Sequence, residues 1–246
     1  VLRAACMNPV IHYGLNVGLL QPGDPADFIV VDNLKDFNVL QTYIKGDLVA
    51  ENGKTLIPSV KTETINHFES YPTITEDYAI KPEGSHIRVI EALEGQLITN
   101  ELIEPARIEG HNIVSDVSRD NLKLAVVNRY TKAKPAIGFI RNFGLKSGAI
   151  ASCVAHDSHN IIAVGATDEE ICRAVNALMD AKGGVAVING KDVSVLPLPV
   201  AGIMSPEDGF EVAERYSKID AKAKNLGTPL QAPFMTLSFM ALLVIP

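Results

Sequence analysis

Short apolar runs bounded by polar residues recur along the first part of the chain. They occupy residues 27–32, 39–44 and 47–51, and Lys45-Gly46 separates the last two. Runs of this length that are rich in β-branched residues are typical of buried strands, and a Gly-containing pair between two of them is typical of a tight turn. The pattern predicts a small sheet, and strands this short need another surface to pack against.

Further apolar runs follow in the second half of the chain. We expect strands at residues 113–116, 122–129, 136–141, 149–155, 161–165, 184–188 and 193–197. Asn189-Gly190 lies between the last two runs and predicts a hairpin. Hairpins without a regular alternation of strand and helix indicate an α+β domain with a mainly antiparallel sheet.

Two helices carry start and stop signals. Thr167 precedes the first, and Glu170 three residues later completes a capping-box pattern ahead of an apolar stripe. The second is predicted to open at Ser205-Pro206 and to close near Asn225. Glu207 and Asp208 are expected in the first turn of the second helix, where the helix dipole favours negative charge.

The patterns divide the chain into three parts. Residues 1–60 form the small-sheet segment, residues 61–82 are polar without a clear period and predict a connector, and residues 83–246 form the α+β domain. An apolar run at residues 234–245 lies between two prolines. A membrane span needs about 20 apolar residues, so this run predicts a core helix or a helix that packs on a partner surface.

Composition restricts the classes of partner. The chain has 246 residues with 22 Lys+Arg against 29 Asp+Glu, a formal net charge of −7. A nucleic-acid backbone requires a basic face, so we expect no nucleic-acid partner, and we expect no membrane partner. The three cysteines are too scattered for a disulfide framework and are typical of a reduced, cytoplasmic protein.

The densest polar cluster is residues 155–160, Ala-His-Asp-Ser-His-Asn, between two apolar runs. A turn makes use of Asp, Ser and Asn but does not need two imidazoles. His156 and His159, with Asp157 between them, are suited to metal ligation or to a proton relay. Two interpretations stay open: a hairpin turn whose histidines are solvated or bonded to backbone, and a functional loop.

The glycine-rich stretch before this cluster, residues 138–148, matches neither a Walker loop nor a GxGxxG turn. Its glycines predict tight hairpins. Lys146 within it is a candidate contact for an anion or a carbonyl group.

Two sets of residues carry a family resemblance. The opening segment, with Asn8-Pro9, Gly14-Leu15, Pro22-Gly23-Asp24 and residues 26–32 (ADFIVVD), resembles the part of metal-dependent amidohydrolases that closes the barrel and completes a small β-sandwich. Residues 139–165, the helix expected from Asp168, and residues 195–205, 227–229 and 232–246 resemble the extra C-terminal domain of bacterial adenine deaminases, a family of that superfamily. The likeness runs over essentially the whole chain, with Cys153 standing where serine is expected.

The resemblance implies hydrolysis of adenine to hypoxanthine and ammonia by a metal-bound hydroxide. In this family a pair of divalent ions, manganese or iron, is held in the barrel by histidines, including an HxH pair, and by acidic residues. The chain contains no HxH pair. We therefore expect it to lack the metal-binding barrel, to hold no metal and to be inactive alone, with that barrel as its partner in the same polypeptide.

Under the resemblance the polar loop reaches the active-site mouth. Asp157 and His159 are then expected to contact the purine or to move a proton, and His156 to position the loop. The substrate-binding candidates are Ser158, Asn160 and Lys146. Two alternatives stay open: a structural or oligomerisation module, whose apolar tail would join a homo-oligomer, and another amidohydrolase that acts on a cyclic amide or a different aminopurine.

Overall fold

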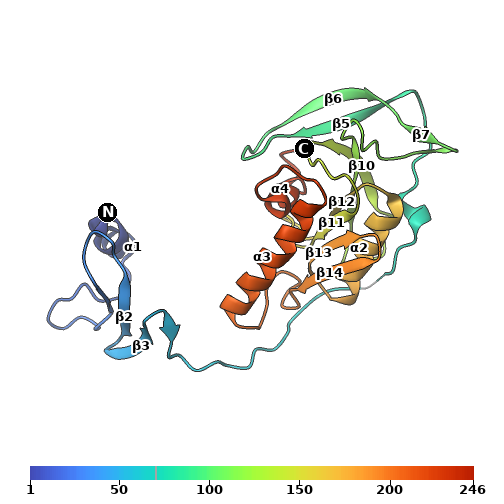
Figure 1. Ribbon diagram of the computed structural model, residues 1–246. Helices are drawn as coiled ribbons and strands as arrows, with labels where there is room; N and C mark the ends of the chain where they lie inside the picture. The colour runs from blue at the N-terminus through green and yellow to red at the C-terminus, as the bar shows by residue number, and fades with distance from the viewer. Residues whose placement is uncertain (70) are drawn as a thin grey trace. The chain divides into compact units, whose positions relative to one another are not determined.

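The computed structural model describes residues 1–69 and 71–246, which divide into two compact units, Val1–Lys61 and Thr62–Pro246 (Figure 1). The first unit begins with the helical segments η1 (Arg3–Met7) and α1 (Asn8–Tyr13). An antiparallel four-stranded sheet follows, in the order β1 (Phe28–Val31), β2 (Val39–Ile44), β3 (Asp47–Glu51) and β4 (Lys54–Thr55).

The strands predicted at residues 39–44 and 47–51 are confirmed at both ends. Lys45 and Gly46 between them have φ values of +52° and +89°. Two successive positive φ values make the tight turn whose twist matches that of the flanking strands.

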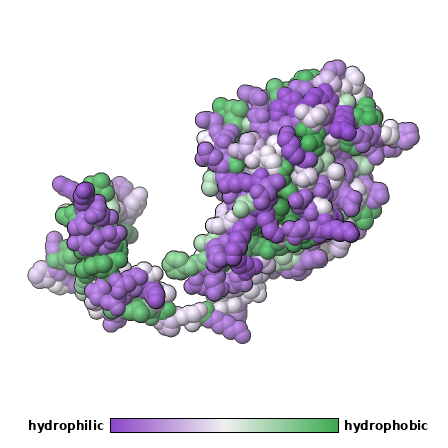
Figure 2. Space-filling view, viewed as in Figure 1, coloured by the Kyte–Doolittle hydropathy of each residue, from purple (hydrophilic) through white to green (hydrophobic). Residues whose placement is uncertain are grey.

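The first unit has no buried interior of its own. None of residues 1–61 is buried, and apolar side chains such as Leu34 and Ile29 remain exposed. Apolar surface is visible on this unit in Figure 2. A small sheet without a buried layer gains little from the hydrophobic effect.

The second unit is built on an eight-stranded sheet in the order β14-β13-β11-β12-β9-β10-β5-β6. All neighbouring strands are antiparallel except the parallel pair β10 and β5, which confirms the α+β class with a mainly antiparallel sheet. The strands are β5 (His86–Ala92), β6 (Thr99–Pro105), β9 (Leu122–Val127), β10 (Ala136–Arg141), β11 (Ala149–Ser152), β12 (Ile161–Gly165), β13 (Gly184–Asn189) and β14 (Asp192–Pro197).

Helices cover both faces of this sheet (Figure 1). One face packs against α2 (Asp168–Asp180), and the other packs against α3 (Gly209–Asn225) and α4 (Pro233–Phe239). Residues of β12 alternate between the two cores: Ile161 and Ala163 lie on the α2 side, whereas Ile162 and Val164 lie on the other. Because successive side chains of a strand point to opposite faces, a strand buried on both sides is apolar throughout.

The two main helices begin with side-chain caps. The Thr167 hydroxyl accepts the Glu170 N–H at 3.2 Å, which confirms the predicted cap of α2. The predicted start of α3 at Ser205-Pro206 is wrong by a few residues. Asp208 is the cap instead, since its carboxylate accepts the backbone N–H groups that open the helix at Gly209.

Segments outside the large sheet also pack on the second unit. Tyr78, in the short helix η2 (Thr75–Tyr78), is fully buried. Only the start of the strand predicted at residues 113–116 forms, as β8 (Asn112–Ile113), which pairs with β7 (Ile108–Glu109). No helix in the described part of the chain has the length and apolar character needed to cross a membrane.

The apolar run at residues 234–245 supplies part of the core. Phe234, Leu237 and Met240 are buried in the cluster that includes α3 and one face of the sheet. Leu243 and Val244 remain exposed. Much of this run is therefore used by the unit itself.

Two glycines of β13 and its hairpin provide a matched test of this packing. A Cβ on Gly184 (φ +128°) would lie 2.1 Å from the carbonyl oxygen of Leu196, whereas one on Gly190 (φ +53°) meets nothing within 4 Å. We expect Gly190→Ala to cost about 1 kcal/mol of unfolding free energy and Gly184→Ala at least about 2 kcal/mol more. Urea unfolding of the two variants measures the difference, and equal losses would contradict it.

Candidate functional site

The polar loop of residues 155–160 connects two of the most buried strands. All residues of β11 and β12 are buried, and the ladder between these strands runs to Ser152 opposite Ile162. The chain leaves the sheet at this end and returns within a few residues. The loop, which is the candidate site, is therefore held between two strands that are buried along their whole length.

Helix α4 supports one side of the loop. The backbone N–H of His156 donates to the carbonyl oxygen of Ser238 at 3.2 Å. The ring of Phe239 lies 5.1 Å from the His156 ring, centroid to centroid. Within the loop, the His159 N–H donates to the carbonyl oxygen of Ala155 at 2.7 Å and closes the turn.

The chain just beyond β9 supports the other side. The Tyr130 hydroxyl donates to the carbonyl oxygen of Ser158 at 2.8 Å, and Arg129 Nη2 donates to that hydroxyl at 2.9 Å. The Arg129 N–H donates to Asn160 Oδ1 at 3.4 Å. Sequence reasoning missed both residues; the available signal was a polar pair placed directly after an apolar strand.

Arg129 is a buried cation, only 4% exposed. Its guanidinium lies over the rings of Tyr130 and Phe68, at 4.7 Å and 5.3 Å from their centroids. Its Nε and Nη1 have no hydrogen-bond partner among the described residues. Aromatic faces stabilise a guanidinium in such a place, so Arg129 acts as a fixed support for the loop.

The loop presents a mixed set of side chains. Asp157 and Ser158 are exposed, whereas His156, His159 and Asn160 are half-buried. The centroids of the two imidazole rings lie 6.3 Å apart. The peptide bond between His156 and Asp157 is cis. His159 has φ +52°, and its buried Nδ1 has no partner in the described structure. An exposed carboxylate beside imidazoles can hold or move a proton at a neighbouring molecule.

These residues do not form a metal site. In the part of the chain that the structure describes, no three His, Cys, Asp or Glu side chains are grouped to hold an ion. Two imidazoles alone leave a metal without the further ligands it requires.

Lys146 is not brought to the loop. It precedes β11, whereas the loop follows that strand, so the two lie at opposite ends of β11. Its backbone N–H donates to the carbonyl oxygen of Leu226 at 2.7 Å, and it lines a separate cavity of about 510 Å³ beside the start of α2. The structure therefore places Lys146 apart from the five polar loop residues.

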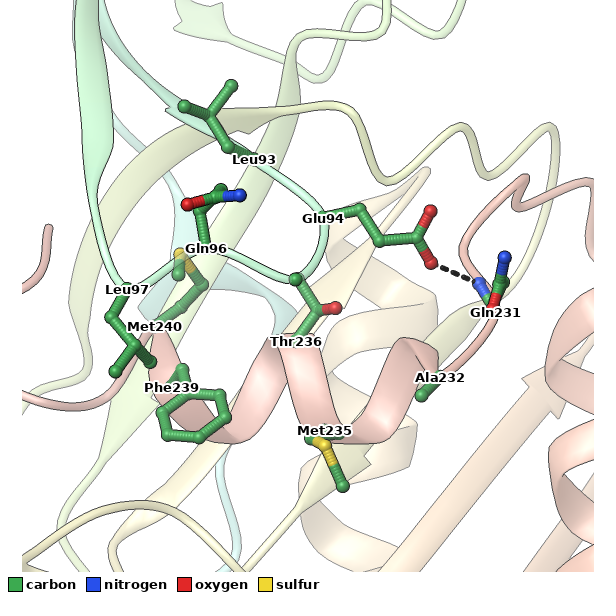
Figure 3. Close-up of a pocket in the computed structure, with 11 residues that line it drawn as sticks. Leu93, Glu94, Gln96, Leu97, Gln231, Ala232, Met235, Thr236, Phe239 and Met240 are labelled. Atoms are coloured by element: carbon green, nitrogen blue, oxygen red, sulfur yellow. Dashed lines mark hydrogen bonds between the residues drawn. The ribbon is translucent and has the colours of Figure 1, made fainter.

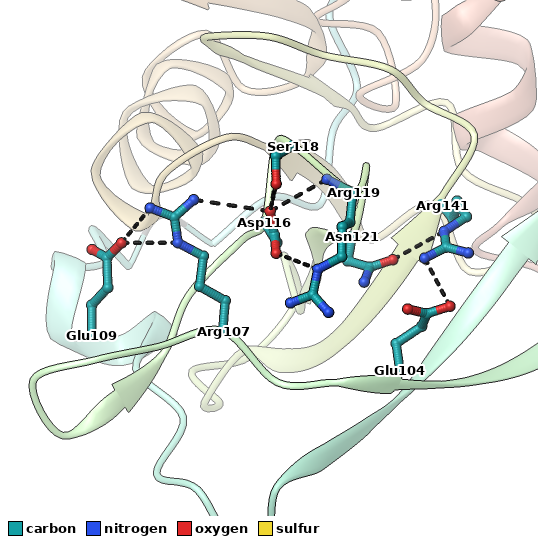
Figure 4. A network of polar contacts seen from close by, with 8 residues as sticks. All are labelled: Glu104, Arg107, Glu109, Asp116, Ser118, Arg119, Asn121 and Arg141. Atoms are coloured by element: carbon teal, nitrogen blue, oxygen red, sulfur yellow. Dashed lines mark hydrogen bonds and ion pairs between the residues drawn. The ribbon is translucent and has the colours of Figure 1, made fainter.

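A second polar cluster surrounds Asp116 (Figure 4). Its carboxylate accepts the Ser118 hydroxyl and Arg119 Nε, each at 2.6 Å, and Arg107 Nη1 lies at 4.0 Å. Burial raises the pKa of Asp116, but the hydrogen bonds from Ser118 and Arg119 outweigh burial and bring it to about 2. Because both oxygens of the Asp116 carboxylate already accept hydrogen bonds from neighbouring residues, this cluster stabilises a turn of the chain.

A cavity of about 540 Å³ lies on the outer side of α4 (Figure 3). It is bounded by the turn between β5 and β6, where Glu94 Oε1 accepts the Gln231 N–H at 2.5 Å. Phe239, which contacts His156, lines this cavity together with Leu97 and Met235. The helix that supports the loop therefore has an open, partly apolar side.

Comparison with known proteins identifies related sequences over the full length. The family described as "Adenine deaminase C-terminal domain" matches residues 96–246, and the family described as "Amidohydrolase family" matches residues 1–49. The chain is 51% identical to an adenine deaminase of Methanosarcina mazei, 53% to one of Sulfurovum sp. and 43% to one of Borreliella burgdorferi. Each match covers 100% of this chain and 45–46% of the relative, so the chain spans about half their length.

The Asp116 cluster gives a pH-dependent prediction. A carboxyl whose folded-state pKa lies near 2, below the ordinary 3.8, stabilises the fold above about pH 4 and loses this contribution as the pH falls towards 2. We expect Asp116→Asn to lower the unfolding free energy by about 2 kcal/mol at neutral pH, and the difference from wild type to shrink between pH 4 and pH 2.

Urea unfolding across this pH range provides the measurement. Glu101→Gln is the control, because Glu101 belongs to an exposed pair with Arg88 at 3.8 Å and exposed pairs contribute little. A constant Asp116→Asn difference down to pH 2 would contradict the prediction.

The support of the loop by Tyr130 is tested by Tyr130→Phe. Loss of one hydrogen bond to the Ser158 carbonyl is worth about 1 kcal/mol, so we expect the His159 amide, which closes the loop, to exchange its hydrogen about fivefold faster. Tyr13→Phe is the matched control, since Tyr13 lies in the first unit and is 73% exposed. Unchanged exchange in Tyr130→Phe would show that α4 alone holds the loop.

Proposed function

The chain belongs to the adenine deaminase family, and from that premise we propose that it is part of an enzyme that hydrolyses adenine to hypoxanthine and ammonia. The observation that carries the proposal is identity of about half over the whole chain to proteins of that name. Because the chain spans about half their length, turnover requires residues beyond those in this chain.

A metal-dependent enzyme is implied by the match of the amidohydrolase family to residues 1–49. We propose that the ions are manganese or iron and that a barrel of the same polypeptide holds them. The exposed apolar face of the first unit, which includes Ile29 and Leu34, suits packing against that barrel. The three cysteines are free, which suits a cytoplasmic location.

We propose that the loop of residues 155–160 lies at the mouth of the active site. Barrel active sites open at the C-terminal ends of the strands, and loops of added domains can cover them. The loop suits this place because two supports hold it while Asp157 stays exposed. Hydrolysis adds water at the carbon that carries the amino group, and the departing nitrogen takes up a proton before it leaves as ammonia.

Within this loop we assign roles by exposure and contact. Asp157 and His159 contact the purine or carry the proton, and His156, which α4 holds, positions the loop. Ser158 and Asn160 are the neighbouring candidates for substrate contact. Lys146 is left out of this site because it lies at the other end of β11.

Two alternatives are separated by simple measurements. Another amidohydrolase substrate would appear in a panel of adenine, guanine, cytosine and dihydroorotate. An oligomerisation role rests on the apolar tail, of which Phe234 and Leu237 are already buried in the unit's own core. Sedimentation with and without the exposed end, Leu243 and Val244, tests that role.

The test of the loop uses the full-length enzyme with manganese and follows adenine consumption by ultraviolet absorbance. We expect Asp157→Asn or His159→Ala to lower kcat by about 100-fold or more, because a positioned proton donor contributes about 10²–10⁴-fold. Thermal melts should stay within a few degrees of wild type, since both side chains lie in a surface loop.

Asp47→Asn and His111→Ala serve as matched controls, because both residues are exposed and lie outside the loop. Wild-type turnover in the Asp157 and His159 variants would make the loop structural. No adenine turnover in the parent enzyme would refute the proposed reaction itself.

A further inference from the structure

Exposed apolar side chains gather around the outer side of α4. Leu97 and Ile98 in the turn between β5 and β6, Met235 on α4, and Leu243 and Val244 after that helix are each exposed by 60% or more. Single exposed apolar residues are ordinary on a protein surface, whereas a contiguous group of them marks an interaction site. We call these five residues the α4 face.

Contacts within the second unit bring the α4 face together. Leu97 and Met235 line the same cavity of about 540 Å³, on the outer side of α4 (Figure 3). The Thr99 hydroxyl donates to the carbonyl oxygen of Ile245 at 2.9 Å, which ties the segment after α4 to the first residue of β6. The α4 face therefore extends from the turn between β5 and β6, across α4, to the residues that follow this helix.

The α4 face carries little free charge. Among the described residues that line its cavity, Glu94 is the charged one, and its carboxylate already accepts the Gln231 N–H. Apolar surface gains free energy when another apolar surface removes it from water. The α4 face is therefore suited to contact with a protein surface and poorly suited to a charged ligand.

The same helix connects the α4 face with the loop of residues 155–160. The backbone of Ser238 accepts the His156 N–H, and the Phe239 ring lies 5.1 Å from the His156 ring, centroid to centroid. Phe239 also lines the cavity of the α4 face. A large body that contacts the loop therefore comes within reach of this face.

The chain before the second unit indicates which body covers the face. Residues 56–65 are exposed and belong to no helix or strand, and they lead from the segment that the amidohydrolase family matches into the second unit. The chain covers 45–46% of its relatives, so more than half of each relative lies outside the matched part. A body tethered by a short flexible linker has an effective concentration on the order of 1 mM, which favours it over a second copy of the chain.

We propose that the α4 face docks against the barrel part of the same polypeptide and that Leu97, Met235 and Leu243 are buried at this contact. The proposal rests on the proposed function for the existence of that barrel, and it identifies the surface by which the second unit meets it. Interfaces between domains of one chain bury about 600–1,500 Å², so a face of a few side chains can form their apolar centre. The face then supplies the binding free energy, which leaves the polar loop beside it free to contact substrate.

The experiment places the photo-reactive residue p-benzoylphenylalanine in the full-length enzyme, instead of Met235 or Leu243, and identifies cross-linked peptides by mass spectrometry. We expect cross-links to peptides that precede this chain in the polypeptide, with the mass of one polypeptide on a denaturing gel. Ile74 is the matched control position, because it is 60% exposed, as Met235 is, and precedes η2, which packs with α2 on the other face of the sheet. We expect no such cross-links from Ile74.

Met235→Glu provides a second measurement on the full-length enzyme. A carboxylate without a partner is costly inside a closed contact, so we expect the Leu97 and Ile98 amides to exchange their hydrogens about tenfold faster in this variant. Ile74→Glu should leave the exchange of these amides unchanged. Thermal melts check that both variants fold.

Three results would overturn the docking of the α4 face. They are cross-links that double the mass on the gel and so join two copies, equal cross-link yields from Met235 and Ile74, and unchanged exchange in folded Met235→Glu. Cross-links to barrel peptides remote from the active-site mouth would uphold docking and refute the proposed place of the loop. None of these measurements needs adenine turnover, so a parent enzyme that is inactive on adenine refutes only the proposed reaction.

Discussion

Burial of β11 and β12 on both faces of the sheet determines where the polar loop lies. Their side chains alternate between a core formed with α2 and a core formed with α3 and α4. A strand that is packed from both sides cannot slip by one residue without exchanging its two faces. The connection between two such strands therefore stays at one end of the sheet. Polar residues can occupy that connection without loss of stability.

The two units differ in how much apolar surface each buries within itself. The second encloses two apolar clusters around its sheet, and its loop is supported from α4 and from Arg129 and Tyr130. The first has no buried residue, although its strands and turns are regular. Regular hydrogen bonding without apolar burial is a weak basis for stability.

Local patterns were sufficient for much of the fold. The strands at residues 39–44, 136–141 and 161–165 appear with the predicted bounds, and Thr167 caps α2 as predicted. Runs of β-branched residues, tight-turn pairs and caps depend on neighbours within a few positions, so they can be inferred from sequence alone. The same patterns indicated the α+β class and singled out the polar loop at residues 155–160.

Only the tertiary structure decided what surrounds that loop. Tyr130 reaches Ser158 across 28 positions of the chain, and Ser238 meets His156 from the last helix. Lys146, close to the loop in sequence, is carried to the opposite end of β11. The sequence alone determined which segments are strands and helices and where polar residues interrupt them. Which of those residues meet was decided by the packing of α2, α3 and α4 on the two faces of the sheet, because that packing brings together groups with no local signal of their contact.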